Sequence, residues 1–186
     1  MSSNSANKII ISPIGDITPD LLVPIGDEIK RIYGYPTEVF ALLDDIDFAF
    51  SPNRNQYHST PVLEQLAFNA PADAIKVLAL VEVDLFIPIL THVYGEAQLG
   101  GKACIVSTIR LNEGRSYLNT QEPFLSRIVK EAIHELGHTF KLRHCREHTC
   151  LMHYCRDESD EDRKSDQLCR YCKVLLEDEI KRMEVK

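Results

Sequence analysis

The sequence lacks the features of an exported or membrane-embedded protein. No apolar run reaches the ~20 residues that a helix needs to cross a bilayer. The first eight residues are polar and serine-rich, so residues 1–7 are expected to form a disordered tail and not a signal peptide. We therefore expect a cytoplasmic protein whose thiols stay reduced and which has no membrane partner.

A concentration of positive charge is also missing. The formal net charge is −7 at pH 7, and the excess of acidic side chains falls within residues 1–140. Proteins that bind nucleic acid neutralise phosphates with lysine and arginine, so no nucleic-acid partner is expected. The chain has 186 residues, 44% of them hydrophobic, and no internal repeat, which suits one sizeable core. We expect a monomer with a single domain over residues 8–186.

What is present is a pair of histidines with an adjacent glutamate. His134 and His138 are four residues apart, so on a helix both imidazoles face one side and can bind a single Zn²⁺. Glu135 is poorly placed to bind the same ion but can take a proton from the attacking water. His144, six residues further on, would be the third ligand. Three protein ligands leave one coordination position open, as in a catalytic zinc site.

Four cysteines follow the histidines. Cys145 and Cys150 are separated by four residues, and Cys169 and Cys172 by two. Two such short spacings are typical of a tetrahedral structural zinc site. The sequence therefore predicts two Zn²⁺ per chain, one catalytic and one structural. The two sites would share a wall, because His144 and Cys145 are neighbours that bind different ions.

In these motifs the chain resembles the archaemetzincins, a family in the metzincin clan of zinc peptidases. The resemblance implies that the three histidines bind the catalytic zinc, with Glu135 as general base, and that the four cysteines bind the structural zinc. It implies that Met152 forms the turn beneath the catalytic zinc. Weaker similarity extends to residues 54–57, Asp84 and residues 95–97.

The resemblance also implies an α/β fold. In this zincin-like architecture, helices pack on a twisted mixed sheet, with an active-site helix after the strands and a zinc-pinned C-terminal part over residues 141–186. An edge strand, expected within residues 91–111, would pair with an extended peptide or protein substrate.

Two positions are unusual. The clan has glycine three residues after the second histidine, where this chain has Lys141, so we expect a positive φ there at a cost of about 1 kcal/mol. The run Met152-His153-Tyr154 resembles the astacin branch, in which the tyrosine approaches the zinc. Tyr154 is accordingly a candidate catalytic residue that donates a hydrogen bond to the oxyanion.

Each motif also has a less specific interpretation. The histidine motif alone could be a chance match on an amphipathic helix, and the cysteines could be buried thiols or disulfides. Met152 could simply fill the core. Cys104 lies in an apolar run and is expected to be buried, whereas Cys155 lies near enough to the zinc loop to replace a ligand. The remaining histidines lack ligand spacing and are expected to be surface or hydrogen-bonded groups: His58, His92, His148 and His153.

The periodicity alternates between strand and helix. Strands are expected at residues 8–14, 36–43, 74–85 and 103–111, and helices at residues 20–33, 62–68, 122–140 and 168–183. Residues 44–59 are expected to form a polar loop, residues 89–94 an edge strand or an irregular segment after Pro88, and the charged run 157–164 a solvated loop or helix start.

The predicted function is zinc-dependent hydrolysis of peptide bonds, with an aminopeptidase acting on small peptides as the finer hypothesis. One alternative is a zinc-binding interaction module with little or no peptidase activity, which the unusual Lys141 would fit. Another is a different zinc-protease clan, in which a downstream glutamate such as Glu158 or Glu161 replaces His144 as ligand.

Overall fold

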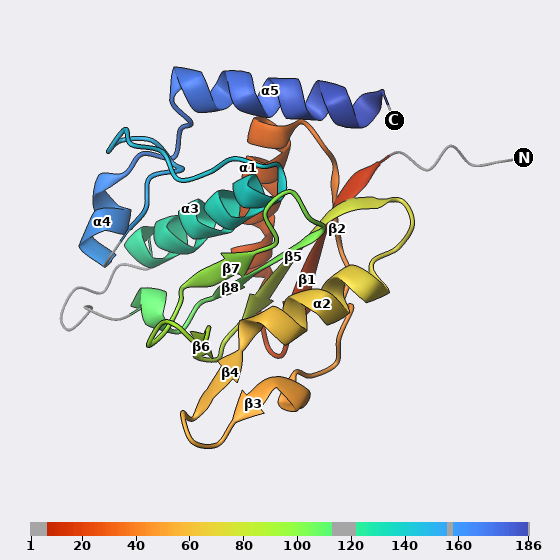
Figure 1. Cartoon of the computed structure of the whole chain (residues 1–186), viewed down its shortest axis with the longest axis vertical. Coiled ribbons are helices and arrows are strands. Elements are labelled where there is room, and N and C mark those ends of the chain that lie inside the picture. Colours follow the sequence, from red (N-terminus) through yellow and green to blue (C-terminus); the bar gives the residue numbers. More distant parts are fainter. Residues whose placement is uncertain (1–6, 113–121, 156–157, 186) are drawn as a thin grey trace, which may run out of the picture.

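The central element of the fold is a five-stranded sheet with helices on both faces (Figure 1). The computed structural model describes residues 7–112, 122–155 and 158–185. The strand order is β2-β1-β5-β8-β7. The strands are β1 (Lys8–Ile14), β2 (Thr37–Val39), β5 (Ala74–Val81), β7 (Gly95–Ala97) and β8 (Ala103–Ser107).

A small second sheet and the helices complete the chain. The small sheet has the order β3-β4-β6, with β3 (Phe50–Ser51), β4 (Gln56–His58) and β6 (Leu85–Phe86). The helices are α1 (Pro19–Tyr33), α2 (Ser59–Asn69), α3 (Glu122–Thr139), α4 (Glu158–Arg163) and α5 (Arg170–Glu184), with 3₁₀ turns η1 (Asp47–Ala49) and η2 (Arg110–Asn112). In the part of the chain that the structure describes, no helix has the length and apolar character required to cross a membrane.

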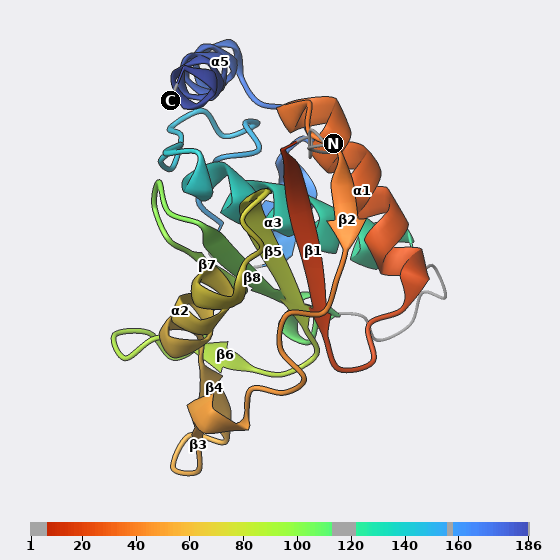
Figure 2. The same cartoon turned by 90° about the vertical axis from the view of Figure 1, so that its right-hand side faces the viewer.

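The alternation of side chains along the buried strands creates two cores. On one face, side chains such as Ile9, Leu78 and Val106 pack with α1 and α3. On the other face, Ile10 and Val77 pack with α2. Successive residues of a strand point to opposite faces, so near-continuous apolar runs are required where helices cover both sides. Figure 2 shows α2 on one face and α1 with α3 on the other.

Strand β7 forms one edge of the main sheet and runs antiparallel to β8. The register pairs Glu96 with Ile105, and the Tyr94 carbonyl accepts from the Ser107 N–H at 2.7 Å. Residues that bond to one neighbouring strand alternate with residues that face the other way. The backbone groups of Gly95 and Ala97 therefore lie at the outer edge of the sheet.

The predicted fold class is confirmed, and most predicted elements are present. Residues 8–14 form β1 as expected, and Pro19 is the first residue of α1. Three strand predictions were too long, because β2, β5 and β8 end at residues 39, 81 and 107. The prediction of a loop at residues 44–59 was wrong, since it contains η1, β3 and β4. The predicted tail falls mainly on residues 1–6, which lie outside the described part.

Candidate metal centre and substrate cleft

Helix α3 carries the histidine motif on one side and its core contacts on the other. Its buried residues Ile128, Ala132 and Leu136 pack into the core beneath the sheet. The opposite positions His134 and His138 then face a cavity, because residues four apart in a helix lie on the same side. The amphipathic pattern of α3 therefore places polar side chains where the sheet edge leaves room for a ligand.

The three predicted histidines converge. The Nε2 atoms of His134 and His138 are 3.1 Å apart, and one ring nitrogen from each histidine, including His144, lies within 4.8 Å of the others. The Nδ1 atoms of His134 and His138 contact the carbonyls of Leu151 and Leu142 at 2.9 and 2.7 Å. A carbonyl can only accept, so Nδ1 carries the proton and Nε2 keeps its lone pair for a metal.

The histidines are held in the neutral state that metal binding requires. Burial lowers the pKa of all three imidazoles, and the Lys164 charge lowers that of His134 further. Neutral imidazoles whose free nitrogens meet at one point form a donor set that suits Zn²⁺. These residues are therefore placed to hold a metal between them.

The turn after α3 holds Lys141 in a left-handed backbone conformation, which residues other than glycine rarely adopt. Lys141 has a φ of 66°, as predicted. Its N–H donates to the His138 carbonyl at 2.9 Å, and the Leu142 N–H donates to the Gly137 carbonyl at 3.1 Å. These two bonds form a Schellman motif, which normally has glycine at this position. The side chain of Lys141 also forms an ion pair, with its Nζ atom 2.6 Å from Glu179 Oε1.

Met152 lies against α3 between the turns that carry the histidines. It is fully buried, and a Cβ atom added to Gly137 would lie 2.6 Å from the Met152 Sδ. The backbone N–H of Cys145 donates to the Met152 carbonyl at 2.7 Å. The thioether thus contacts the helix where only a glycine leaves space, and the same residue anchors the chain that follows His144.

Glu135 lies under the edge strand in a buried cluster of charges. A Cβ atom added to Gly95 would lie 2.6 Å from the Glu135 Cγ, so a glycine is required for the carboxylate to pack against β7. Burial raises the pKa of Glu135 well above its usual value, the Glu131 carboxylate raises it further, and Lys164 opposes the shift. Lys164 Nζ lies 3.6 Å from Glu131 Oε2.

Lys164 was not expected in this cluster. The sequence predicted a solvated charge run at residues 157–164, and for Lys164 this was wrong, since only 2% of the residue is exposed. The residue lies just after α4, and its side chain compensates buried negative charge on α3. A run of mixed charges does not reveal that one member points inward. The i, i+4 spacing of Glu131 and Glu135, by contrast, was a readable signal for a second carboxylate in the site.

The cavity beside the histidines has a volume of about 390 Å³. One wall is the irregular segment from Ile87 to Gly95, which includes His92 and Tyr94. The opposite side consists of Glu131, Glu135 and the three histidines, together with Tyr154 and Cys155. His92 was expected at the surface or in a hydrogen bond, and the sequence offered no signal for its place in this wall.

Tyr154 and Cys155 lie at the rim of the cavity. The rings of Tyr154 and His144 have centroids 5.0 Å apart, and Tyr154 is 50% exposed. Cys155 lies apart from the four-cysteine group. Cys104 is fully buried, as predicted. The side chains of Glu158 and Glu161, the alternative ligands, lie outside the part of the chain that the structure describes.

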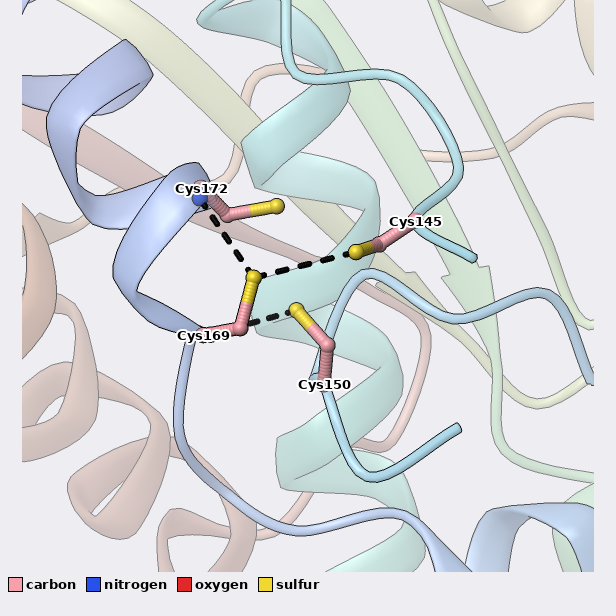
Figure 3. A group of neighbouring side chains, drawn as sticks. All are labelled: Cys145, Cys150, Cys169 and Cys172. Carbon is pink, nitrogen blue, oxygen red and sulfur yellow. Dashed lines mark hydrogen bonds between the residues drawn. The ribbon is translucent and has the colours of Figure 1, made fainter. Parts of the chain in front are cut away.

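The four predicted cysteines gather between the loop after His144 and the start of α5 (Figure 3). Their sulfur atoms all lie within 4.8 Å of one another, and those of Cys145 and Cys169 are 3.7 Å apart. The Cys150 sulfur accepts from the Cys169 N–H at 3.3 Å, and the Cys169 sulfur accepts from the Cys172 N–H at 3.5 Å. Backbone donors aimed at sulfur stabilise thiolates.

The electrostatics of this group favour a shared cation. Burial acts to raise the pKa of Cys169, but hydrogen bonds from the Cys172 backbone and from Cys150 lower it below its usual value. Burial raises the pKa of Cys172, and the charge of Cys150 raises it further. A tetrahedral Zn²⁺ would supply the positive charge that allows four cysteines this close to bind as thiolates.

The remaining histidines have other contacts. The ring of His58 stacks on Phe86 with centroids 5.2 Å apart. His148 Nδ1 and His153 Nε2 are 3.2 Å apart, and His153 Nδ1 bonds to the Cys145 carbonyl at 2.9 Å. The pair thus supports the loop after the third histidine.

A carboxylate next to convergent, neutral imidazoles is arranged for hydrolysis assisted by a metal, and the open edge strand above it suits an extended peptide. The class that fold and site define is therefore that of the zinc metallopeptidases. Residues 27–178 match the model of Peptidase family M54. The chain belongs to this family, the archaemetzincins.

The similarity to individual relatives extends over nearly the whole chain. The archaemetzincin of Methanocaldococcus jannaschii is 33% identical and covers 92% of this chain and 93% of its own length. The crystal structure of archaemetzincin from Methanopyrus kandleri has a TM-score of 0.82 at 30% identity, with 96% and 98% of the two chains covered. A zinc-dependent peptidase from Methanocorpusculum labreanum has a TM-score of 0.78 at 29% identity, with coverage of 90% and 99%.

Proposed function

We propose that His134, His138 and His144 hold a catalytic zinc and that Glu135 is the general base in peptide hydrolysis. The observation that carries this assignment is the convergence of the histidine nitrogens, within 4.8 Å of one another, at the wall of the cavity that Glu135 also lines. When bound, zinc supplies Lewis-acid chemistry, which makes water more acidic and polarises a carbonyl.

The protein residues perform the proton transfers. Glu135 accepts a proton as water attacks the scissile carbonyl and then returns it to the leaving amine. Glu135 lines the cavity beside the three histidines, which places its carboxylate within reach of a water bound there. The buried Lys164 limits the excess of negative charge around Glu131 and Glu135.

The edge of β7 would align the substrate. The outward backbone groups of Gly95 and Ala97 can pair with an extended peptide, as in other complexes where a peptide adds a strand to a sheet. Because Gly95 lies directly over Glu135, a peptide bonded there would pass across the carboxylate. This relation between edge strand and base supports peptide bonds as the substrate class.

We propose that the four cysteines bind a second, structural zinc, so that the chain holds two ions. This ion would tie α5 to the loop that presents His144, since Cys145 follows His144 directly and Cys169 caps the N-terminus of α5. Thiolate binding requires reduced cysteines, which supports a cytoplasmic location. The monomeric state stays a prediction.

Tyr154 is proposed to donate a hydrogen bond to the oxyanion that forms as water adds to the carbonyl. Its ring packs beside that of His144 at the cavity rim, which supports this role. We expect Tyr154→Phe to lower kcat about tenfold or more while KM changes little, since one oxyanion donor typically contributes at least this much. Steady-state kinetics on one peptide would measure this, and unchanged turnover would refute the role.

The finer proposal is an aminopeptidase that acts on small peptides. Glu131 adds a second carboxylate to the cavity lining, and a carboxylate is the kind of group that binds a free α-amino group. A hydrogen bond to a charged group contributes about 1.5–3 kcal/mol, so blocking the amine should lower kcat/KM about 10- to 100-fold.

The experiment uses zinc-loaded protein and a library of short peptides, each with a free and an acetylated N-terminus. We expect cleavage of the free series, its loss when a chelator removes zinc, and recovery on zinc addition. Glu131→Gln should reduce the preference for the free series. Equal cleavage of both series would indicate an endopeptidase, and no cleavage by zinc-loaded protein would favour the interaction-module alternative.

A further inference from the structure

The cavity wall from Ile87 to Gly95 has little secondary structure of its own. Its internal bonds include the turn from the Leu90 N–H to the Ile87 carbonyl, at 3.0 Å, and the wall joins β6 through the Val93 N–H and the Leu85 carbonyl, also at 3.0 Å. Pro88 cannot donate to a ladder, so it cannot lie within a central strand. A segment of this kind keeps one position only if other parts of the chain hold it.

Two side chains from the β3–β4 hairpin reach this wall. Arg54 Nη2 donates to the carbonyls of Leu90 and Thr91 at 2.7 and 3.0 Å. Gln56 Nε2 donates to the same Thr91 carbonyl at 2.9 Å. Leu90 and Thr91 both line the cavity. The side chains of Arg54 and Gln56 thus both donate to the Thr91 carbonyl, in the middle of the cavity wall.

The two side chains are themselves fixed. Arg54 Nε donates to Gln56 Oε1 at 3.0 Å, and the guanidinium lies 4.2 Å from the centre of the Phe86 ring. Gln56 Nε2 also donates to Asp84 Oδ2 at 2.9 Å, and Asp84 pairs with Arg110 through two bonds of 2.5 Å. Every bond is consistent with one orientation of the Gln56 amide, which is 6% exposed as a residue. Such a network restricts the motion of the wall far more than a single surface hydrogen bond would.

We propose that Arg54 and Gln56 are positioning residues for substrate: they hold the wall so that a peptide meets a preformed cleft. The inference rests on the proposed peptidase function of the same cavity. The histidines and Glu135 belong to α3 and the following turn, so losing these bonds leaves the metal ligands in place. The loosened wall must then be ordered each time a peptide binds, which weakens peptide binding more than it slows the chemical step.

The test uses two conservative variants, Arg54→Lys and Gln56→Met. Lysine keeps the charge but not the fork that reaches two carbonyls and Gln56, and methionine keeps the shape of Gln56 without its donors. Arg31→Lys is the matched control. Arg31 donates to the side chains of Glu28 and Gln167 and to the carbonyl of Asp166, all of them outside the cleft.

For both variants we expect KM for the best-cleaved library peptide to rise about tenfold while kcat stays within about twofold. The zinc content and the inhibition constant of acetohydroxamate, a metal ligand too small to need the wall, should not change. Hydrogen–deuterium exchange should increase in peptides covering residues 87–95 and not in α3. The Arg31→Lys protein should match the wild type in each measurement.

An unchanged KM with unchanged exchange at residues 87–95 would overturn the inference, even if the wild type is an active peptidase. So would an equal loss of affinity for acetohydroxamate and peptide, which would indicate a general structural role. If zinc-loaded wild type neither cleaves peptides nor binds acetohydroxamate, the proposed function itself fails, and the inference fails with it.

Discussion

Replacement of Glu135 by glutamine should abolish most turnover and leave the zinc in place. The amide keeps the size of the side chain but cannot accept the proton, and general-base catalysis typically contributes about 10²- to 10⁴-fold. We therefore expect kcat to decrease by a factor in this range. KM should change little, because the peptide contacts with β7 remain. Zinc content should equal that of the wild type, since Glu135 is not among the grouped metal donors.

Glu28→Gln is a suitable control for this change. Glu28 is also a glutamate engaged by a charged partner, Arg31, but it lies on α1 outside the cavity. Kinetics with the best-cleaved library peptide and zinc analysis on both variants would test whether Glu135 acts as the general base. A Glu135→Gln protein that cleaves peptides at the wild-type rate would remove Glu135 from the mechanism.

Loss of one of the four proposed cysteine ligands should have the largest effect on stability. We expect Cys172→Ser to release the structural zinc and to lower the free energy of unfolding by at least about 4 kcal/mol, because metal binding at structural sites is folding energy. The loop between Cys145 and Cys150 would lose its link to α5, and His144 precedes this loop directly. Catalytic activity should therefore fall together with stability. Chemical denaturation and zinc analysis measure the two effects.

Cys155→Ser provides the matched comparison. Cys155 is a neighbouring thiol outside the four-cysteine group, so its replacement should leave the zinc content unchanged and shift the unfolding free energy by less than about 1 kcal/mol. If Cys172→Ser kept both the zinc and the stability of the wild type, the cysteines would be buried thiols and not a metal site. If Cys155→Ser lost the zinc instead, the ligand assignment would be wrong.

The zinc motifs were readable in the sequence because their geometry is local. A helical spacing of four fixes the relation of His134 to His138, and short loops bring cysteine pairs together. The positive φ of Lys141 was expected from the resemblance, because the clan has glycine at this position, although the Schellman bonds that hold it became visible only in the structure. Periodicity likewise predicted β1, α1 and α3, where apolar faces are buried on long elements.

The cleft wall could not be predicted from the sequence, because the contacts that hold it join segments far apart in the chain. Arg54 and Thr91 are 37 residues apart, and no periodic pattern links an arginine in a short hairpin to a carbonyl in an irregular segment. The buried position of Lys164 likewise involves a contact with a distant segment, because its partner Glu131 lies on α3. Spacing reveals contacts within one element, whereas contacts between distant segments depend on how the whole chain packs.

The measurement that tests the central claim most directly is the number of zinc ions per chain, determined by elemental analysis after saturation with zinc and dialysis. It compares the wild type with His138→Ala. Two separate sites predict about two zincs in the wild type and about one in the variant, because the cysteine group does not depend on His138. Equal zinc content in the two proteins would contradict a catalytic zinc held by these histidines.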